Sequence, residues 1–129
     1  MDMDLQYDQR KEEFRRRTKA FASAVIKLYC SLPKGRAEVQ VLGKQLLRSG
    51  TSVAANYRVA SRPRSDSEFV SKIDQCAQEA DESMLWLELL RDDCGIRSEI
   101  LDWLLKEADE LIAIFVTMSK RVKARLSEA

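Results

Sequence analysis

The run SGTSVAANY, residues 49–57, carries no charge and consists mostly of small side chains. Charged residues make up 33% of the chain, so such a run needs a structural reason. Gly43 and Gly50 lie seven residues apart, which places both on one face of a helix. Each glycine inside a helix costs about 1 kcal/mol relative to alanine. A helix face this bare allows close approach of another backbone, so the run predicts tight helix-on-helix packing around Gly50.

The composition favours an all-helical protein. The chain has 129 residues, with four glycines, two prolines, 45% hydrophobic and 7% aromatic residues. This balance is typical of long helices rather than of strands joined by many turns. A chain of this length buries about two thirds of its surface when it folds as one unit. We therefore expect residues 1–129 to form a single all-α domain.

Apolar residues recur at alternating steps of three and four along four stretches of the chain. These repeats predict helices at residues 8–32, 37–60, 65–94 and 98–126. Pro33, Pro63 and Gly95 follow or close the first three of them. The clearest start signal is the S-x-x-E spacing of Ser65 and Glu68, which is typical of a capping box. Because the connections are short, the pattern predicts an antiparallel, up-down-up-down four-helix bundle.

The cysteines and the hydropathy pattern indicate a cytoplasmic protein. Cys30, Cys76 and Cys94 are odd in number and show no C-x-x-C spacing, so neither a disulfide framework nor a zinc site is predicted. The charged beginning of the chain lacks the apolar stretch of a signal peptide. No run approaches the roughly 20 apolar residues of a membrane span. We therefore expect no contact with a membrane.

The sequence offers little that is typical of an enzyme. The chain has no histidine, which the Glu-x-x-His pairs of a ferritin-like metal site require. It also lacks a glycine-rich phosphate loop, a nucleophile elbow and a Cys–His pair. The carboxylates Glu79, Asp81 and Glu82 are more typical of a solvated or interfacial face than of general acids or bases. We expect no catalysis, no metal and no cofactor.

Basic residues are concentrated at three places that a four-helix bundle brings together. These places are the start of the first helix, the connection after the second and the end of the fourth. Thirteen basic residues would meet at this pole: Arg10, Lys11, Arg15, Arg16, Arg17, Lys19, Arg58, Arg62, Arg64, Lys120, Arg121, Lys123 and Arg125. Such a surface would bind the phosphates of RNA or DNA with a strong dependence on salt. The alternative interpretation is a solvated surface with cations near helix C-termini.

A second set of residues is predicted to lie at a subunit interface or in a polar network. The stretch MLWLELL, residues 84–90, has more apolar side chains than one core can bury, so Trp86 and Leu89 are candidates for contact between subunits. Asn56 would join charged neighbours to fix the register of helices or subunits. The alternatives are an exposed Asn56 and a small-residue face that packs only within the molecule. The full set is Arg48, Gly50, Asn56, Tyr57, Glu79, Glu82, Trp86 and Leu89.

The segments QLLRSGTSVAANYR (45–58), RSDSEFVSKI (64–73) and EADESMLWLELL (79–90) together resemble one known family. It is the bacterial four-helix bundle family first noticed as open reading frames in intervening sequences of 23S rRNA genes. The resemblance covers residues 42–90 and, through the apolar patterns of the first and fourth helices, most of the chain.

This resemblance implies a four-helix bundle that assembles into a homopentameric ring. A related branch of the family serves as accessory protein of diversity-generating retroelements, in which a basic pentamer binds reverse transcriptase and nucleic acid. The expected function is therefore a non-enzymatic homo-oligomeric scaffold or adaptor, with RNA, DNA or a ribonucleoprotein as partner. The alternative is the retroelement accessory role.

Overall fold

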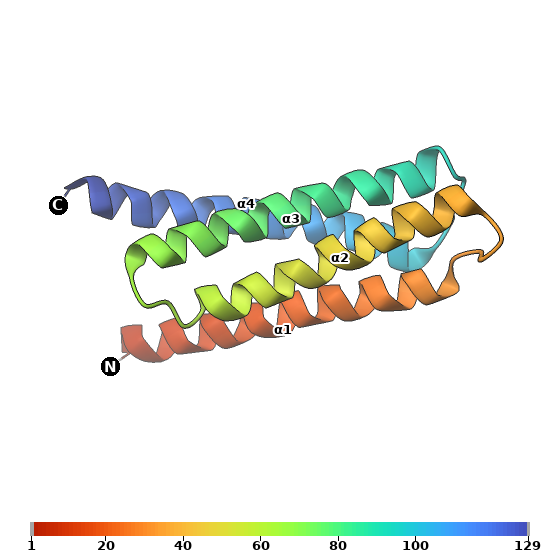
Figure 1. Cartoon of the computed structure of the whole chain (residues 1–129). Helices are drawn as coiled ribbons and strands as arrows, with labels where there is room; N and C mark the ends of the chain where they lie inside the picture. Colours follow the sequence, from red (N-terminus) through yellow and green to blue (C-terminus); the bar gives the residue numbers. More distant parts are fainter. Residues whose placement is uncertain (1, 129) are drawn as a thin grey trace.

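The computed structural model describes residues 2–128, and it describes side chains for residues 9–128. Its helices are α1 (Asp2–Ser31), α2 (Ala37–Ala60), α3 (Asp66–Asp92) and α4 (Glu99–Glu128). Successive helices run in opposite directions, and the start of α1 lies at the same end of the bundle as the end of α4 (Figure 1). The predicted all-α four-helix bundle is confirmed. Among residues 2–128, no helix is long and apolar enough to cross a membrane.

The starts of the helices agree with the predicted signals except in α1. Ser65 caps α3, and its side chain accepts a hydrogen bond from the backbone N–H of Glu68 at 3.0 Å. The Glu68 carboxylate reaches back to the backbone N–H of Arg64 at 3.0 Å, one residue before the cap. Helix α1 begins at Asp2, six residues before the predicted start, since neither glycine nor proline interrupts residues 2–8.

The end of α3 follows the predicted glycine signal. Gly95 adopts a left-handed conformation with φ of 71°. The next backbone N–H, that of Ile96, donates to the carbonyl of Leu90 at 2.9 Å. This bond satisfies a carbonyl that the last turn of the helix leaves without a partner. The chain therefore turns sharply after α3, at the end of the bundle opposite the start of α1 (Figure 1).

One cluster of buried side chains joins all four helices. Phe21, Leu46, Leu87 and Phe115, one from each helix, are fully buried. Each such side chain contributes about 1.5–3 kcal/mol when removed from water. Tyr57 lies between two aromatic rings of the cluster, with ring centroids 6.2 Å from Phe14 and 6.1 Å from Phe115. The core therefore extends along the whole length of the bundle.

The small-residue face of α2 packs against α1 within the same molecule. A Cβ atom at Gly50 would lie 2.7 Å from Cγ2 of Val25, and one at Gly43 would lie 2.7 Å from Cδ1 of Leu32. Both distances are shorter than van der Waals contact, so the two helices approach as closely as the sequence predicts. Gly50 and Tyr57 were candidates for a subunit interface. The structure places both in the core instead.

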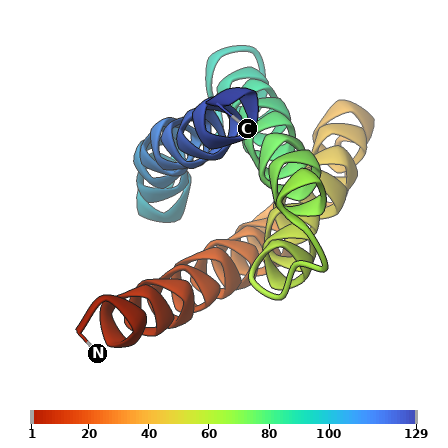
Figure 2. The ribbon, with the colours of Figure 1, turned by 90° about the vertical axis from the view of Figure 1, so that its left-hand side faces the viewer.

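The packing is uneven around the bundle. Helix α3 packs extensively on α2 and α4, whereas α1 packs well on α2 and only slightly on α4. Seen along the bundle axis, the ribbon of the first half of α1 diverges from that of the second half of α4 (Figure 2). We call the region between these two half-helices the α1–α4 seam.

Candidate nucleic-acid interface

The structure distributes the thirteen basic residues over different parts of the surface. Five form ion pairs with carboxylates: Arg15 with Glu12, Arg17 with Glu107 and Glu110, Arg64 with Glu68, Lys123 with Asp74, and Arg125 with Asp66. Arg10 and Arg121 line a groove in the α1–α4 seam, and Lys120 is exposed on α4. The others lie on α1, at the end of α2 or in the connection that follows it: Lys11, Arg16, Lys19, Arg58 and Arg62. Lys19 lies beyond the midpoint of the 30-residue α1, not at the pole where it was expected.

Arg15 fixes the end of α2 against α1. Its Nε donates to the hydroxyl of Ser61 at 2.9 Å, and this hydroxyl donates to the carbonyl of Arg58 at 2.9 Å. Ser61 is buried, while Arg58 and Arg62 on either side of it are exposed. Arg15 also lies 3.5 Å from Glu12, which offsets part of its charge. The bond between Arg15 and Ser61 therefore brings exposed Arg58, in the last turn of α2, and Arg62, just after it, beside the basic part of α1.

Helix α1 carries more positive charge than the sequence prediction included. Between Glu13 and Glu38 the chain has no acidic residue and seven basic ones: Arg15, Arg16, Arg17, Lys19, Lys27, Lys34 and Arg36. Arg16, Lys19 and Lys27 are exposed, and their spacing places them on the outer side of the helix. The prediction missed Lys27 because it considered only the expected pole. The long interval without acidic residues is the signal that would have found it.

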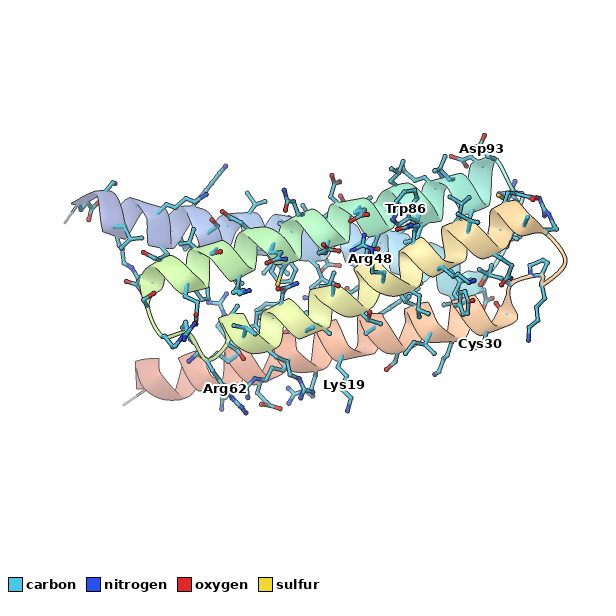
Figure 3. The ribbon with its side chains drawn as sticks, viewed as in Figure 1. Lys19, Cys30, Arg48, Arg62, Trp86 and Asp93 are labelled. Atoms are coloured by element: carbon cyan, nitrogen blue, oxygen red, sulfur yellow. The ribbon has the colours of Figure 1, made fainter. Side chains whose placement is uncertain are left out.

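We define the basic strip as Arg16, Lys19 and Lys27 on α1 together with Arg58 and Arg62 at the end of α2. Lys19 and Arg62 both project beyond α1 at the lower edge of the bundle (Figure 3). Arg16 and Lys27 are eleven residues apart, so the α1 part of the strip extends over about 16 Å. Tyr57 is buried in the core and cannot stack on a base. Tyr57 therefore offers no stacking platform beside the charges of the strip.

The predicted polar network forms between α2 and α3, but without Asn56. Arg48 binds Glu79, with 3.3 Å between its guanidinium and the carboxylate, and it also binds Glu82. The hydrogen bond that Arg48 donates to Glu82 and the charge of both carboxylates raise the pKa of Arg48. The side-chain amide of Asn56 donates instead to the carbonyl of Ser52 at 2.9 Å, one turn earlier in the same helix. The network thus holds two helices of one molecule together.

The polar contact between α2 and α3 continues into the core. The hydroxyls of Ser49 and Ser83 lie 2.7 Å apart, and Ser83 also donates to the carbonyl of Glu79 at 2.8 Å. Both serines are fully buried. Since each buried hydroxyl has a partner, these small polar residues let α2 and α3 pack closely without leaving a hydrogen bond unmade.

The apolar surface of α3 remains a candidate for contact with another molecule. Leu85 is 46% exposed, and Trp86 and Leu89 are half-buried. The indole N–H of Trp86 is buried and has no hydrogen-bond acceptor among the described residues. Figure 3 shows Trp86 near Arg48, beside the contact of α2 with α3. In residues 9–128, no group of three or more Cys, Asp or Glu side chains is arranged to hold a metal ion.

Comparison with known proteins agrees with the predicted relationship. Residues 10–117 match the 23S rRNA-intervening sequence protein family. The chain belongs to this family. A crystal structure from Bacteroides thetaiotaomicron VPI-5482, described as a protein of unknown function from the S23 ribosomal protein family, has a similar fold with a TM-score of 0.74. It is 31% identical, and the match covers 82% of this chain and 97% of that one. No curated protein matches the chain.

Proposed function

We propose that this member of the family is a homo-oligomeric helical scaffold that binds RNA or DNA through the basic strip and catalyses no reaction. The observation that carries the proposal is the stretch between Glu13 and Glu38, residues 14–37, which has seven basic residues and no acidic one. Arg16, Lys19 and Lys27 from this interval are exposed on one side of α1. The Arg15–Ser61 bond adds the exposed Arg58 and Arg62, at the C-terminal end of α2, to the same edge.

The dimensions of the strip fit a phosphate backbone. One strand of a duplex carries a charge for about every 3.4 Å of helix axis, so about 16 Å of helix α1 spans four or five phosphates. Contacts of this kind position a nucleic acid without reading its sequence. Binding to one subunit would be weak, and several copies of the strip on one assembly would strengthen it by avidity.

Self-association is the second part of the proposal, and the surface of α3 supports it. Leu85 and the half-buried Trp86 and Leu89 give this helix an exposed apolar area. Apolar areas of this kind on a soluble protein mark sites of association. A pentamer is the assembly that the family resemblance implies.

The test is a salt titration with nucleic acid. We would measure binding of a fluorescent RNA hairpin by anisotropy between about 50 and 200 mM salt, where a backbone contact loses affinity steeply. The variant Lys19→Ala/Lys27→Ala should bind more weakly and reduce the log–log slope against salt by about 2 per subunit. The control is Arg97→Ala/Lys106→Ala, which removes two exposed charges from elsewhere on the surface.

Three outcomes of the binding experiment would contradict the proposal. Wild-type protein that ignores RNA at the lowest salt would refute the proposal. So would binding that does not weaken with salt, or a control variant that loses as much affinity as Lys19→Ala/Lys27→Ala. A protein-only measurement of mass by light scattering decides separately whether the chain self-associates.

A further inference from the structure

The middle of α4 is apolar on all sides, although the bundle covers only part of it. Residues 111–118, LIAIFVTM, include no charged side chain. Leu111 and Phe115 are fully buried, while Ile112, Ile114 and Met118 are half-buried. The remaining residues, Ala113, Val116 and Thr117, are exposed. A helix with no polar face is normally buried on all sides. The middle of α4 is therefore less buried than its apolar sequence predicts.

Part of this uncovered surface forms a groove in the α1–α4 seam. The groove has a volume of about 220 Å³ and is lined by Arg10, Ala113, Ile114, Thr117, Met118 and Arg121. Its floor is apolar, and an arginine from each helix stands at its edge. Arg16 lines an adjoining hollow and adds one positive charge. Glu13 lines the same hollow, and its carboxylate offsets one of the positive charges there. The groove is therefore suited to an apolar surface that carries negative charge.

The chain itself has a surface with this chemistry. On the outer side of α3, Asp81, Leu85, Glu88 and Asp92 follow one another at steps of four, three and four residues, and all four are exposed. We call these four residues the acidic ridge. Leu85 is its apolar centre, and the half-buried Leu89 lies one turn away on the same helix. Helix α3 packs on α2 and α4 but not on α1, so its ridge cannot reach the seam of its own molecule.

We propose that the acidic ridge of one copy docks into the α1–α4 groove of a second copy. Leu85 would contact the floor formed by Ile114 and Met118. The carboxylates of Asp81 and Glu88 would face Arg10 and Arg121, since Asp92 already pairs with Arg91 at 2.6 Å. The two surfaces differ, so the contact is head-to-tail, and repetition of it builds a ring or a filament rather than a two-fold dimer. This inference rests on the self-association in the proposed function and assigns its two surfaces. It leaves Lys19, Lys27, Arg58 and Arg62 of the basic strip open for nucleic acid, whereas Arg16 borders the groove.

Charge reversal tests the pairing of the two surfaces. The variant Leu85→Lys/Glu88→Lys makes the ridge basic, and Thr117→Glu/Arg121→Glu makes the groove acidic. All four positions are exposed, so the monomer should fold normally, as circular dichroism can verify. Each double variant should raise the self-dissociation constant about 10- to 100-fold, because it places like charges together. The control is Lys34→Glu, which reverses an exposed charge in the connection between α1 and α2.

The decisive sample carries all four substitutions in one chain. Its basic ridge matches its acidic groove, so light scattering should show recovery of the wild-type mass. An equal mixture of the two double variants should also reassemble, since each supplies the surface that the other lacks. Wild-type mass in either double variant, or failure of the four-substitution chain to recover, would overturn the pairing while self-association stands. A wild-type protein that is monomeric would overturn the inference and self-association together, and the RNA titration would still decide the basic strip.

Discussion

An alanine at Gly50 tests the close contact between α1 and α2. Its Cβ atom would lie 2.7 Å from Cγ2 and 3.1 Å from Cγ1 of Val25, whereas carbon atoms in favourable contact are about 3.5–4.0 Å apart. Val25 is fully buried. A valine in a helix also has one strongly preferred rotamer, so its methyl groups cannot turn away. The new methyl group must therefore push the two helices apart.

Two opposing effects set the size of the change. Alanine gains about 1 kcal/mol of helix propensity over glycine, and overpacking a core costs about 1–3 kcal/mol. We expect Gly50→Ala to lower the free energy of unfolding by about 1 kcal/mol. Gly43→Ala is the matched comparison. Its Cβ would meet Cδ1 of Leu32, the mobile end of a longer side chain, at 2.7 Å, and the ring of the half-buried Tyr29 at 3.1 Å. That variant should lose less stability than Gly50→Ala, because the end of Leu32 can move and alanine gains helix propensity.

Urea unfolding followed by circular dichroism measures both effects, at one protein concentration because assembly also affects stability. Val25→Ala alone should cost about 2 kcal/mol, as it removes two buried methyl groups. In the double variant Val25→Ala/Gly50→Ala, part of the lost free energy of unfolding should be recovered. The coupling energy between the two substitutions should be about 1 kcal/mol. The explanation fails if Gly50→Ala is as stable as Gly43→Ala, or if the effects at Val25 and Gly50 simply add.

Two further measurements address the capping of α3 and the buried thiol. Ser65→Ala removes the acceptor for the N–H of Glu68 and should lower the free energy of unfolding by about 1 kcal/mol, whereas exposed Ser67→Ala should have little effect on the urea midpoint. Burial raises the pKa of Cys76 to about 12, compared with about 8.5 in an unfolded chain. Above pH 8.5 the unfolded state therefore loses this proton first, and stability should fall as pH rises toward 12. Cys76→Ala should flatten that fall, and an equal slope in the variant would contradict the assignment.

The sequence predicted those parts of the fold that depend on local signals. Both bounds of α2, the Ser65 cap and the turn at Gly95 are confirmed, because each depends on residues within one or two turns. The start of α1 was wrong because residues 2–8 contain no stop signal. Periodicity identified the bare face of α2 correctly. It gave no information about whether that face meets α1 or another subunit.

The candidate site was harder to predict because its charges depend on partners from distant parts of the chain. Glu107 holds Arg17 and Asp74 holds Lys123, and no local pattern indicates either pair. Asn56 had a partner within its own helix, the carbonyl of Ser52, which competes with any network across helices. Because α1 begins six residues earlier than predicted, Lys19 lies about 9 Å farther along the bundle axis from the pole than the prediction placed it.

The α1–α4 seam also affects how the protein opens. Helix α1 is tied to α4 by few contacts, among them the ion pairs of Arg17, whereas α3 is packed on both of its neighbours. Cooperative units with the least packing detach first in local unfolding. Helix α1 should therefore exchange its amide protons through openings that leave α2, α3 and α4 together. Because α1 carries most of the basic strip, a bound nucleic acid would protect most strongly the helix that otherwise opens first.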